Sequence, residues 1–196
     1  MDVYTEAELR ESLADFKDYA LKIEKRNKRL GLKSRLPNMP EEVSENIAKF
    51  IVQNHMNDQT ALWPKGTKGK VKLPGDLRSD SFGRLEVKCF TSTGPISFGP
   101  TEAWDTLLFL DATDWRNDRF VMYGVSLANN DPLWEAVQIS KKQTYGDQCK
   151  AKRRPRIGWG ALSPQITSNC TKVFDGTFDE VFVNSQQTQR GCSSVG

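Results

Sequence analysis

The chain has 196 residues, with 28 Lys and Arg, 25 Asp and Glu and one His, so its formal net charge at pH 7 is +3. This length fits one domain with a sizeable core and would be crowded for two. Hydrophobic residues make up 37% of the chain, and no apolar run approaches the roughly 18 residues that a membrane-spanning helix needs. We therefore expect a soluble, single-domain protein.

Two helices are predicted at the start of the chain. Residues 5–30 place apolar side chains at spacings of three and four, from Leu9 to Ile23, which is typical of an amphipathic helix. A second helix is predicted in residues 36–54, where Asn38 is a candidate cap and Pro40 lies at the helix start. Residues 63–75 are rich in Lys, Gly, Thr and Pro and predict a loop or an irregular strand edge.

The middle of the chain predicts strands. Residues 85–90 alternate in polarity, residues 106–111 form a continuous apolar run, and residues 119–127 resemble the next strand. Residues 134–140 fit either a strand or a helix. Around Asp175-Gly176, residues 173–183 predict a short strand or turn followed by a helix or strand. We therefore expect an α/β domain with a mixed central sheet.

The histidine and cysteine content excludes several kinds of chemistry. His55 is the single histidine, so sites that need several imidazoles are excluded. Cysteines occur at 89, 149, 170 and 192, too far apart for a zinc knuckle, and we expect free thiols. The acidic N-terminus lacks the pattern of a secretory signal, which favours the cytoplasm.

Charge is strongly segregated along the chain. Residues 17–35 sum to +6, residues 64–90 to +4, residues 91–140 to −5 and residues 141–156 to +6. Basic segments separated by acidic ones suggest a positive face assembled in three dimensions, which suits a polyanion such as DNA. The alternative is an ordinary solvated surface.

One group of residues predicts hydrolytic chemistry. Asp76 is followed after nine residues by Glu86-Val87-Lys88, in which Glu86 and Lys88 share one face of a strand. Two converging carboxylates hold a hard divalent cation such as Mg²⁺, and a nearby ammonium orients or helps to deprotonate an attacking water. The carbonyl of Val87 is a further candidate ligand. The alternative is a simple ion pair between Glu86 and Lys88.

This arrangement resembles the active-site signature of the PD-(D/E)xK nuclease superfamily, and among its members the type II restriction endonucleases are most similar. The resemblance extends to LPNMPEEVSENIAKF, KCFTSTGPISFGP and QTYGDQCKAKRRPRI, and covers roughly residues 36–182. One departure is Gly75, which stands where the signature usually has proline before the aspartate.

The resemblance implies a restriction-endonuclease-like core with a mixed sheet flanked by helices. With the predicted helix and the polar C-terminal residues, the single domain divides into an N-terminal helical segment (1–35), a catalytic core (36–182) and a flexible tail (183–196). The resemblance implies Mg²⁺ bound by Asp76 and Glu86, with Mn²⁺ as a substitute, and a catalytic Lys88. Some members add a glutamate from an N-terminal helix, for which Glu45 or Glu42 is the candidate here.

Candidate DNA contacts follow the catalytic strand and occupy the basic segment near 150. A guanidinium can bind guanine bidentately, hydroxyls and amides can read base edges, and glycines let the backbone approach DNA closely. The candidates are Ser92, Ser97, Lys141, Lys142, Gln143, Thr144, Tyr145, Gln148, Arg153, Arg154 and Arg156. The alternative for most of them is plain surface.

Three functions remain open at this point. The first is a Mg²⁺-dependent type II endonuclease that cuts double-stranded DNA at a short palindrome as a homodimer. Such an enzyme implies a methyltransferase that protects the same site. The second is a structure-specific repair or recombination nuclease, and the third is a DNA-binding module without catalysis.

Overall fold

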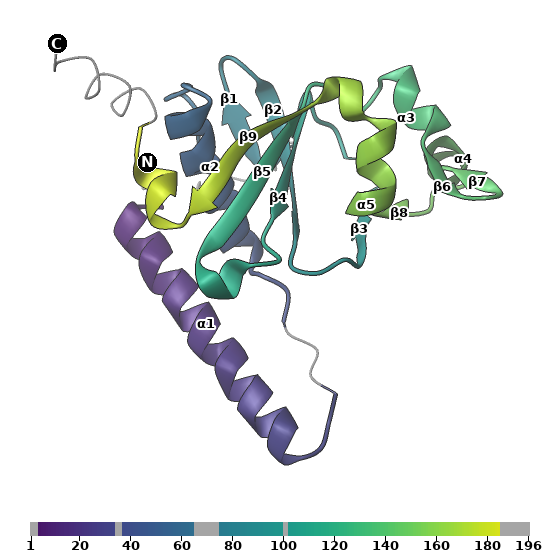
Figure 1. The fold of residues 1–196 in the computed structure, drawn as a ribbon. Helices are drawn as coiled ribbons and strands as arrows, with labels where there is room; N and C mark the ends of the chain where they lie inside the picture. Colours follow the sequence, from purple (N-terminus) through teal and green to yellow (C-terminus); the bar gives the residue numbers. More distant parts are fainter. Residues whose placement is uncertain (1–3, 34–36, 65–74, 100–101, 185–196) are drawn as a thin grey trace, which may run out of the picture.

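The computed structural model describes residues 4–33, 37–64, 75–99 and 102–184 (Figure 1). Its centre is a five-stranded sheet in the order β1-β2-β4-β5-β9. Strands β2 and β4 run parallel, whereas the other neighbouring pairs run antiparallel. The predicted α/β fold with a mixed central sheet is therefore confirmed.

The bounds of the elements are as follows. The strands are β1 (Leu77–Ser79), β2 (Gly83–Phe90), β3 (Pro95–Ser97), β4 (Thr106–Asp111), β5 (Arg119–Val125), β6 (Gln138–Ser140), β7 (Gln143–Thr144), β8 (Arg156–Gly158) and β9 (Cys170–Thr177). The α-helices are α1 (Glu6–Arg29), α2 (Glu41–His55), α3 (Pro132–Ala136), α4 (Tyr145–Lys150) and α5 (Trp159–Leu162). The 3-10 turns are η2 (Trp115–Asn117), η3 (Ser163–Gln165), η4 (Thr167–Asn169) and η5 (Asp179–Phe182).

Both predicted N-terminal helices are present. Helix α1 begins after Thr5, whose side chain and that of Glu8 form a reciprocal capping box. Helix α2 begins after Pro40, so the expectation that Asn38 caps it is wrong. Proline has no side-chain acceptor, and Glu41 and Glu42 in the first turn instead complement the helix dipole.

The sheet separates two hydrophobic cores. The first core packs the buried faces of α1 and α2 against β-strand side chains such as Leu85, Val87 and Leu108. The second core packs the opposite face, with Phe90, Leu107 and others, against the segments that hold α3, α4 and α5. Strand β4 is buried along almost its whole length, as predicted for a strand that is covered on both faces.

Two small sheets extend the molecule beside the second core. Strand β3 pairs with β8, and β6 pairs with β7 in a short hairpin. In Figure 1 these elements lie with α3, α4 and α5 on one side of the central sheet, and α1 lies on the other. The ambiguous residues 134–140 contain the end of α3 and all of β6.

The C-terminal prediction is confirmed in its strand alternative. No turn occurs at Asp175-Gly176, because both residues lie inside β9, which starts at Cys170 and pairs with β5 as far as Thr177. The sequence pattern misses only the start of this strand, because its outward positions are polar or charged. The following element is the short 3-10 helix η5, which agrees with the helix alternative.

Other expectations concern thiols, loops and membranes. The cysteines within the described ranges, at 89, 149 and 170, are free as expected. Most of the predicted 63–75 loop and of the 183–196 tail lies outside the described residues. In the part of the chain that the structure describes, no helix combines the length and apolar character needed to cross a bilayer.

Lys49 of α2 is a buried cation and predicts a pH effect. Its side chain is fully buried, and its Nζ donates to the Tyr4 carbonyl at 2.7 Å and lies 4.0 Å from the centre of the Phe50 ring. Burial lowers the pKa of Lys49 to about 8, and the charge of Glu8 opposes this shift. Between this value and the ordinary lysine pKa, the unfolded chain binds more protons than the folded one, so stability rises with pH.

We therefore expect Lys49→Met to remove part of that rise. Denaturant unfolding of both proteins at about pH 7 and about pH 9.5 measures it, with a slope of at most roughly 1.4 kcal/mol per pH unit from one group. The gain in unfolding free energy should be larger in the wild type than in Lys49→Met. Equal gains would contradict a depressed lysine pKa.

Candidate active site

Asp76 lies immediately before β1 and is fixed against β2. Its backbone N–H donates to the Leu85 carbonyl at 2.9 Å, and its carboxylate accepts from the Val87 N–H at 2.9 Å. Gly75 has φ +86°, and an added Cβ would lie 3.3 Å from the Leu85 carbonyl oxygen. The departure from the usual proline therefore has a local reason, since proline cannot adopt positive φ.

Glu86 and Lys88 project from the same face of β2, as the alternation predicts. The Lys88 ammonium donates to the Glu86 carboxylate at 2.7 Å, and the two side chains are 11% and 9% exposed. Since Asp76 is anchored to the residues on both sides of Glu86, the two carboxylates belong to one site. The structure thus brings together the three residues that the spacing singled out.

The electrostatics of this pair follow from its burial. Burial raises the pKa of Glu86 to about 7, with a further upward contribution from the Asp76 charge, while Lys88 opposes the shift. For Lys88, burial disfavours the ammonium, but the carboxylates of Glu86 and Glu102 outweigh it and raise its pKa. A bound cation would stabilise the ionised form of Glu86, because this carboxylate is buried beside the carboxylate of Asp76.

Glu102 is a further residue of the site that sequence reasoning missed. Its carboxylate accepts a second hydrogen bond from the Lys88 ammonium at 2.9 Å. It packs over Gly99, where an added Cβ would come within 2.7 Å of its Oε1. Phe98 lies beneath Lys88, with its ring centre 5.7 Å from Nζ. No motif spacing marks Glu102, because it reaches Lys88 from a loop.

The donor set of the site suits a hard cation. In an extended strand the N–H and carbonyl of one residue point to the same edge, so the Val87 carbonyl lies on the edge where its N–H meets Asp76. The available donors are the oxygens of Asp76, Glu86 and Val87, the type that Mg²⁺ prefers. Across the described ranges, no group of three or more His, Cys, Asp or Glu side chains is arranged to hold a metal. Mg²⁺ tolerates such a sparse set, because it keeps several waters.

Comparison with known proteins decides the family. A sequence profile of the Bsp6I restriction endonuclease family matches residues 5–161. The chain belongs to the Bsp6I restriction endonuclease family. Within 120 residues it is 29% identical to the type II restriction enzyme Bsp6I of Bacillus sp. (strain RFL6). That match covers 61% of this chain and 62% of the length of the relative, and no solved structure matches.

The matched range of this Bsp6I family member includes Asp76, Glu86, Lys88 and Glu102. Membership also agrees with the restriction-endonuclease-like organisation that the resemblance implied, in which helices precede the strands of a mixed sheet. Strand β9 lies beyond the matched residues and completes that sheet.

The candidate glutamates of α2 lie elsewhere in this family member. Helix α2 covers the first core, whereas Glu86 and Lys88 project from the opposite face of the sheet. Glu45 is 3% exposed, and its carboxylate accepts from the Trp63 indole N–H at 2.6 Å. Glu42 is exposed in the first turn of α2. Among the contacts that the structure describes, neither Glu45 nor Glu42 reaches the Lys88 ammonium.

The basic DNA-contact candidates lie on the side of the sheet that carries the second core. Lys141 and Lys142 form the exposed tip of the β6–β7 hairpin. Arg153 and Arg154 lie in an exposed loop, as predicted, and Arg156 begins β8. None of these five cations forms an ion pair within the described ranges, so their charges are available to a polyanion.

The polar candidates differ in their surroundings. Gln143 accepts from the Gln148 amide at 3.1 Å on the surface, whereas Thr144 is engaged in the capping box of α4. Ser97 lies on β3, and its hydroxyl is buried without a hydrogen-bond partner. Ser92 lies in the exposed turn that follows β2.

Tyr145 does not fit the expectation of a surface base reader. It is 6% exposed, and its ring packs at 5.5 Å from Phe98 and 5.3 Å from Trp134 between ring centres. Burial also raises the pKa of its hydroxyl strongly. Its polar tip misled the sequence interpretation, because the apolar ring packs in the second core. We therefore leave it out of the proposed DNA contacts.

Proposed function

We propose that the chain is a Mg²⁺-dependent type II endonuclease that hydrolyses phosphodiester bonds of double-stranded DNA at a short palindrome. The observation that carries the proposal is the junction of Asp76, Glu86 and Lys88 at the β1–β2 edge in a member of a restriction endonuclease family. The relative named above is a type II restriction enzyme. Catalysis by oxygen ligands and an ammonium also fits a chain with one histidine.

The residues of the site have distinct roles in this proposal. Asp76 and Glu86, with the Val87 carbonyl, would hold Mg²⁺, or Mn²⁺ in its place. The bound metal supplies Lewis-acid stabilisation of the negative charge that develops on the phosphate. Lys88 Nζ orients the attacking water next to the scissile phosphate. Glu102 accepts a second hydrogen bond from the Lys88 ammonium and so helps to hold it in place, and the Phe98 ring lies beneath it.

The exposed cations of the hairpin and of the loop before β8 would bind DNA. Lys141, Lys142, Arg153, Arg154 and Arg156 supply phosphate or guanine contacts. Ser92, Gln143 and Gln148 are the polar candidates at the surface, whereas the Ser97 hydroxyl is buried and the Thr144 side chain caps α4. A palindromic site is read by a two-fold symmetric protein, so we propose a homodimer. The function further implies a protective methyltransferase and action in the cytoplasm, where the cellular DNA lies.

Metal removal tests the proposal directly. Purified protein is incubated with unmethylated phage-sized DNA in Mg²⁺ or in EDTA, and fragment ends are sequenced. We expect discrete fragments with a common end sequence in Mg²⁺ and intact DNA in EDTA. Asp76→Asn should abolish the fragments, whereas Glu135→Gln, an exposed carboxylate that pairs with Lys150, should not.

The same assay separates the competing functions. Cleavage confined to branched DNA would favour a repair nuclease. DNA binding without cleavage of any substrate in Mg²⁺ would favour a binding module, in which Asp76, Glu86 and Lys88 are a structural ion cluster. Either result would contradict a type II restriction enzyme.

A further inference from the structure

Arg78 of β1 lies on the same face of the catalytic hairpin as the site residues. It pairs with Arg84 across the β1–β2 ladder, and Leu77 beside it is fully buried in the first core. Since side chains alternate along a strand, Arg78 and Arg84 project toward the face that carries Glu86. Arg78 follows Asp76 by two residues, which is about 6.6 Å along an extended strand.

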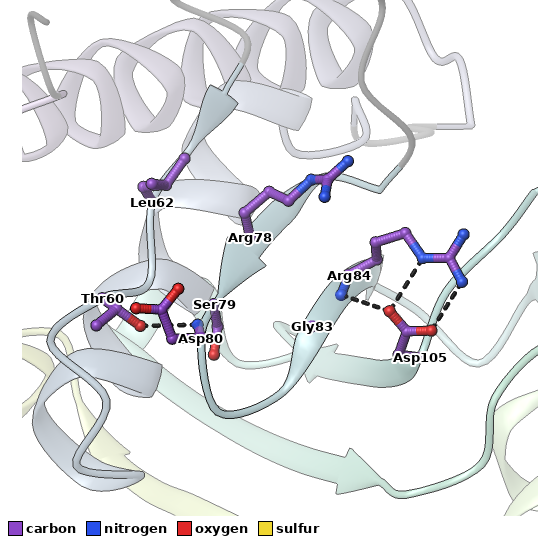
Figure 2. Close-up of a pocket in the computed structure, with 8 residues that line it drawn as sticks. All are labelled: Thr60, Leu62, Arg78, Ser79, Asp80, Gly83, Arg84 and Asp105. Atoms are coloured by element: carbon purple, nitrogen blue, oxygen red, sulfur yellow. Dashed lines mark hydrogen bonds and ion pairs between the residues drawn. The ribbon is translucent and has the colours of Figure 1, made fainter.

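Arg84 has its charge matched within the protein. Its guanidinium binds the two carboxylate oxygens of Asp105 at 3.0 and 2.7 Å, and its backbone N–H donates to the same carboxylate at 2.8 Å. These bonds lower the pKa of Asp105 to about 2, so this carboxylate stays ionised. Figure 2 shows the pair closed on itself beside Gly83.

Arg78, in contrast, has donors without acceptors. Its guanidinium forms no ion pair with any described carboxylate, and its Nε is buried without a hydrogen-bond partner. In Figure 2 its side chain extends away from Asp80 and toward the side of the hairpin that carries Arg84, and its charge contributes to the lowered pKa of Asp105 without an ion pair between them. The buried Nε is shielded from solvent, so an acceptor such as a phosphate would meet the terminal Nη groups of the guanidinium, which can donate two parallel hydrogen bonds to it.

Arg78 and the Arg84–Asp105 pair border a pocket of about 430 Å³. It is lined by Thr60, Leu62, Arg78, Ser79, Asp80, Gly83, Arg84 and Asp105. The buried Asp58 fixes one wall, because its carboxylate accepts from the Ser79 hydroxyl and from the Ser81 N–H. The position of Arg78 at the pocket is therefore set by a rigid hairpin.

We propose that Arg78 binds a DNA phosphate that flanks the scissile phosphate on the same strand. The inference rests on the proposed nuclease function, in which Asp76 and Glu86 define the position of the scissile phosphate. Arg78 follows Asp76 by two residues on the same face of the hairpin, so the phosphate that it binds would be a neighbour of the scissile phosphate. Arg84, held by Asp105, lines the site and does not itself neutralise the phosphate. Arg78 thus contributes to binding and register rather than to the chemical step.

Salt-dependent binding of a short DNA duplex in EDTA tests this inference. Neutralising one phosphate of B-DNA contributes about 0.9 to the slope of log K against log salt. We expect Arg78→Ala to reduce the magnitude of this slope by about the same amount. Arg78→Lys should preserve the slope but weaken binding, because lysine keeps the positive charge and loses the two parallel hydrogen bonds of a guanidinium. The control is Arg119→Ala, which removes a guanidinium paired with Asp175 at 3.2 Å on β5 and β9.

Steady-state cleavage provides the second readout. Arg78→Ala should raise KM several-fold and leave kcat near the wild-type value. A slope, KM and kcat equal to those of the wild type would overturn the role of Arg78 while leaving the nuclease proposal intact. If the wild type itself neither binds nor cuts DNA, the proposed function fails instead. Thermal unfolding of each variant identifies any loss that comes from misfolding.

Discussion

Replacing Lys88 with alanine is expected to lower the cleavage rate by about 10²- to 10⁴-fold, the range typical of a lost group that positions or transfers a proton. Lys88 is the ammonium at the junction of Glu86 and Glu102, and nothing else described supplies a cation there. Single-turnover cleavage of DNA in Mg²⁺ measures the rate, and binding in EDTA shows whether DNA affinity is retained.

A milder substitution tests the contact between Glu102 and Lys88 while keeping the lysine. Gly99→Ala places a methyl group where Glu102 now packs, since the added Cβ would lie 2.7 Å from Oε1. The end of this flexible side chain must then move, so we expect a smaller loss of kcat with little change in KM. Glu102→Gln should act in the same direction. Full activity in Lys88→Ala would contradict the catalytic assignment, whatever the result for Gly99→Ala.

Phe98→Ala is expected to cost about 3–5 kcal/mol of unfolding free energy, the usual loss for a large aromatic side chain removed from a core. Phe98 is fully buried, and its ring centre lies 5.9 Å from that of Trp134 and 6.2 Å from that of Trp104. It thus joins the sheet to the segments that carry α3 and α4. Equilibrium denaturation in urea measures the loss.

Phe98→Leu is the matched control, because it keeps much of the apolar volume and should cost far less. A loss below about 1 kcal/mol for Phe98→Ala would show that the second core can collapse around the cavity. The ring also lies beneath the Lys88 ammonium, so cleavage should fall in Phe98→Ala even where the protein remains folded.

Periodicity predicted the elements whose buried faces are strongly apolar. Helix α1, helix α2 and strand β4 follow from regular spacing, and the alternation in β2 correctly placed Glu86 and Lys88 on one face. Strand β9 was harder, because an edge strand with polar outward positions gives a weak pattern. Its assignment depends on pairing with β5, which is a long-range property.

The candidate site shows the same division between local and long-range information. Asp76, Glu86 and Lys88 lie within one hairpin, so spacing alone could bring them together. Glu102 reaches Lys88 from a loop, and the Tyr145 ring packs into the second core. A short stretch of sequence predicts neither contact, because both depend on how distant segments pack. Arg78 was overlooked because only the ladder shows that it faces the same way as Glu86.

Strand β9 follows the other four strands of the central sheet in the sequence, which bears on when the protein acquires its fold during synthesis. Val121 of β5 pairs with Asp175 of β9, and this pairing must await the emergence of β9 from the ribosome. All the proposed catalytic residues are translated well before it. Because pairing distant segments is slow compared with forming local hairpins, the complete sheet assembles last. A nascent chain therefore carries the β1–β2 hairpin with Asp76, Glu86 and Lys88 for a time before the five-stranded sheet is finished, so the complete sheet cannot form until β9 has been synthesised.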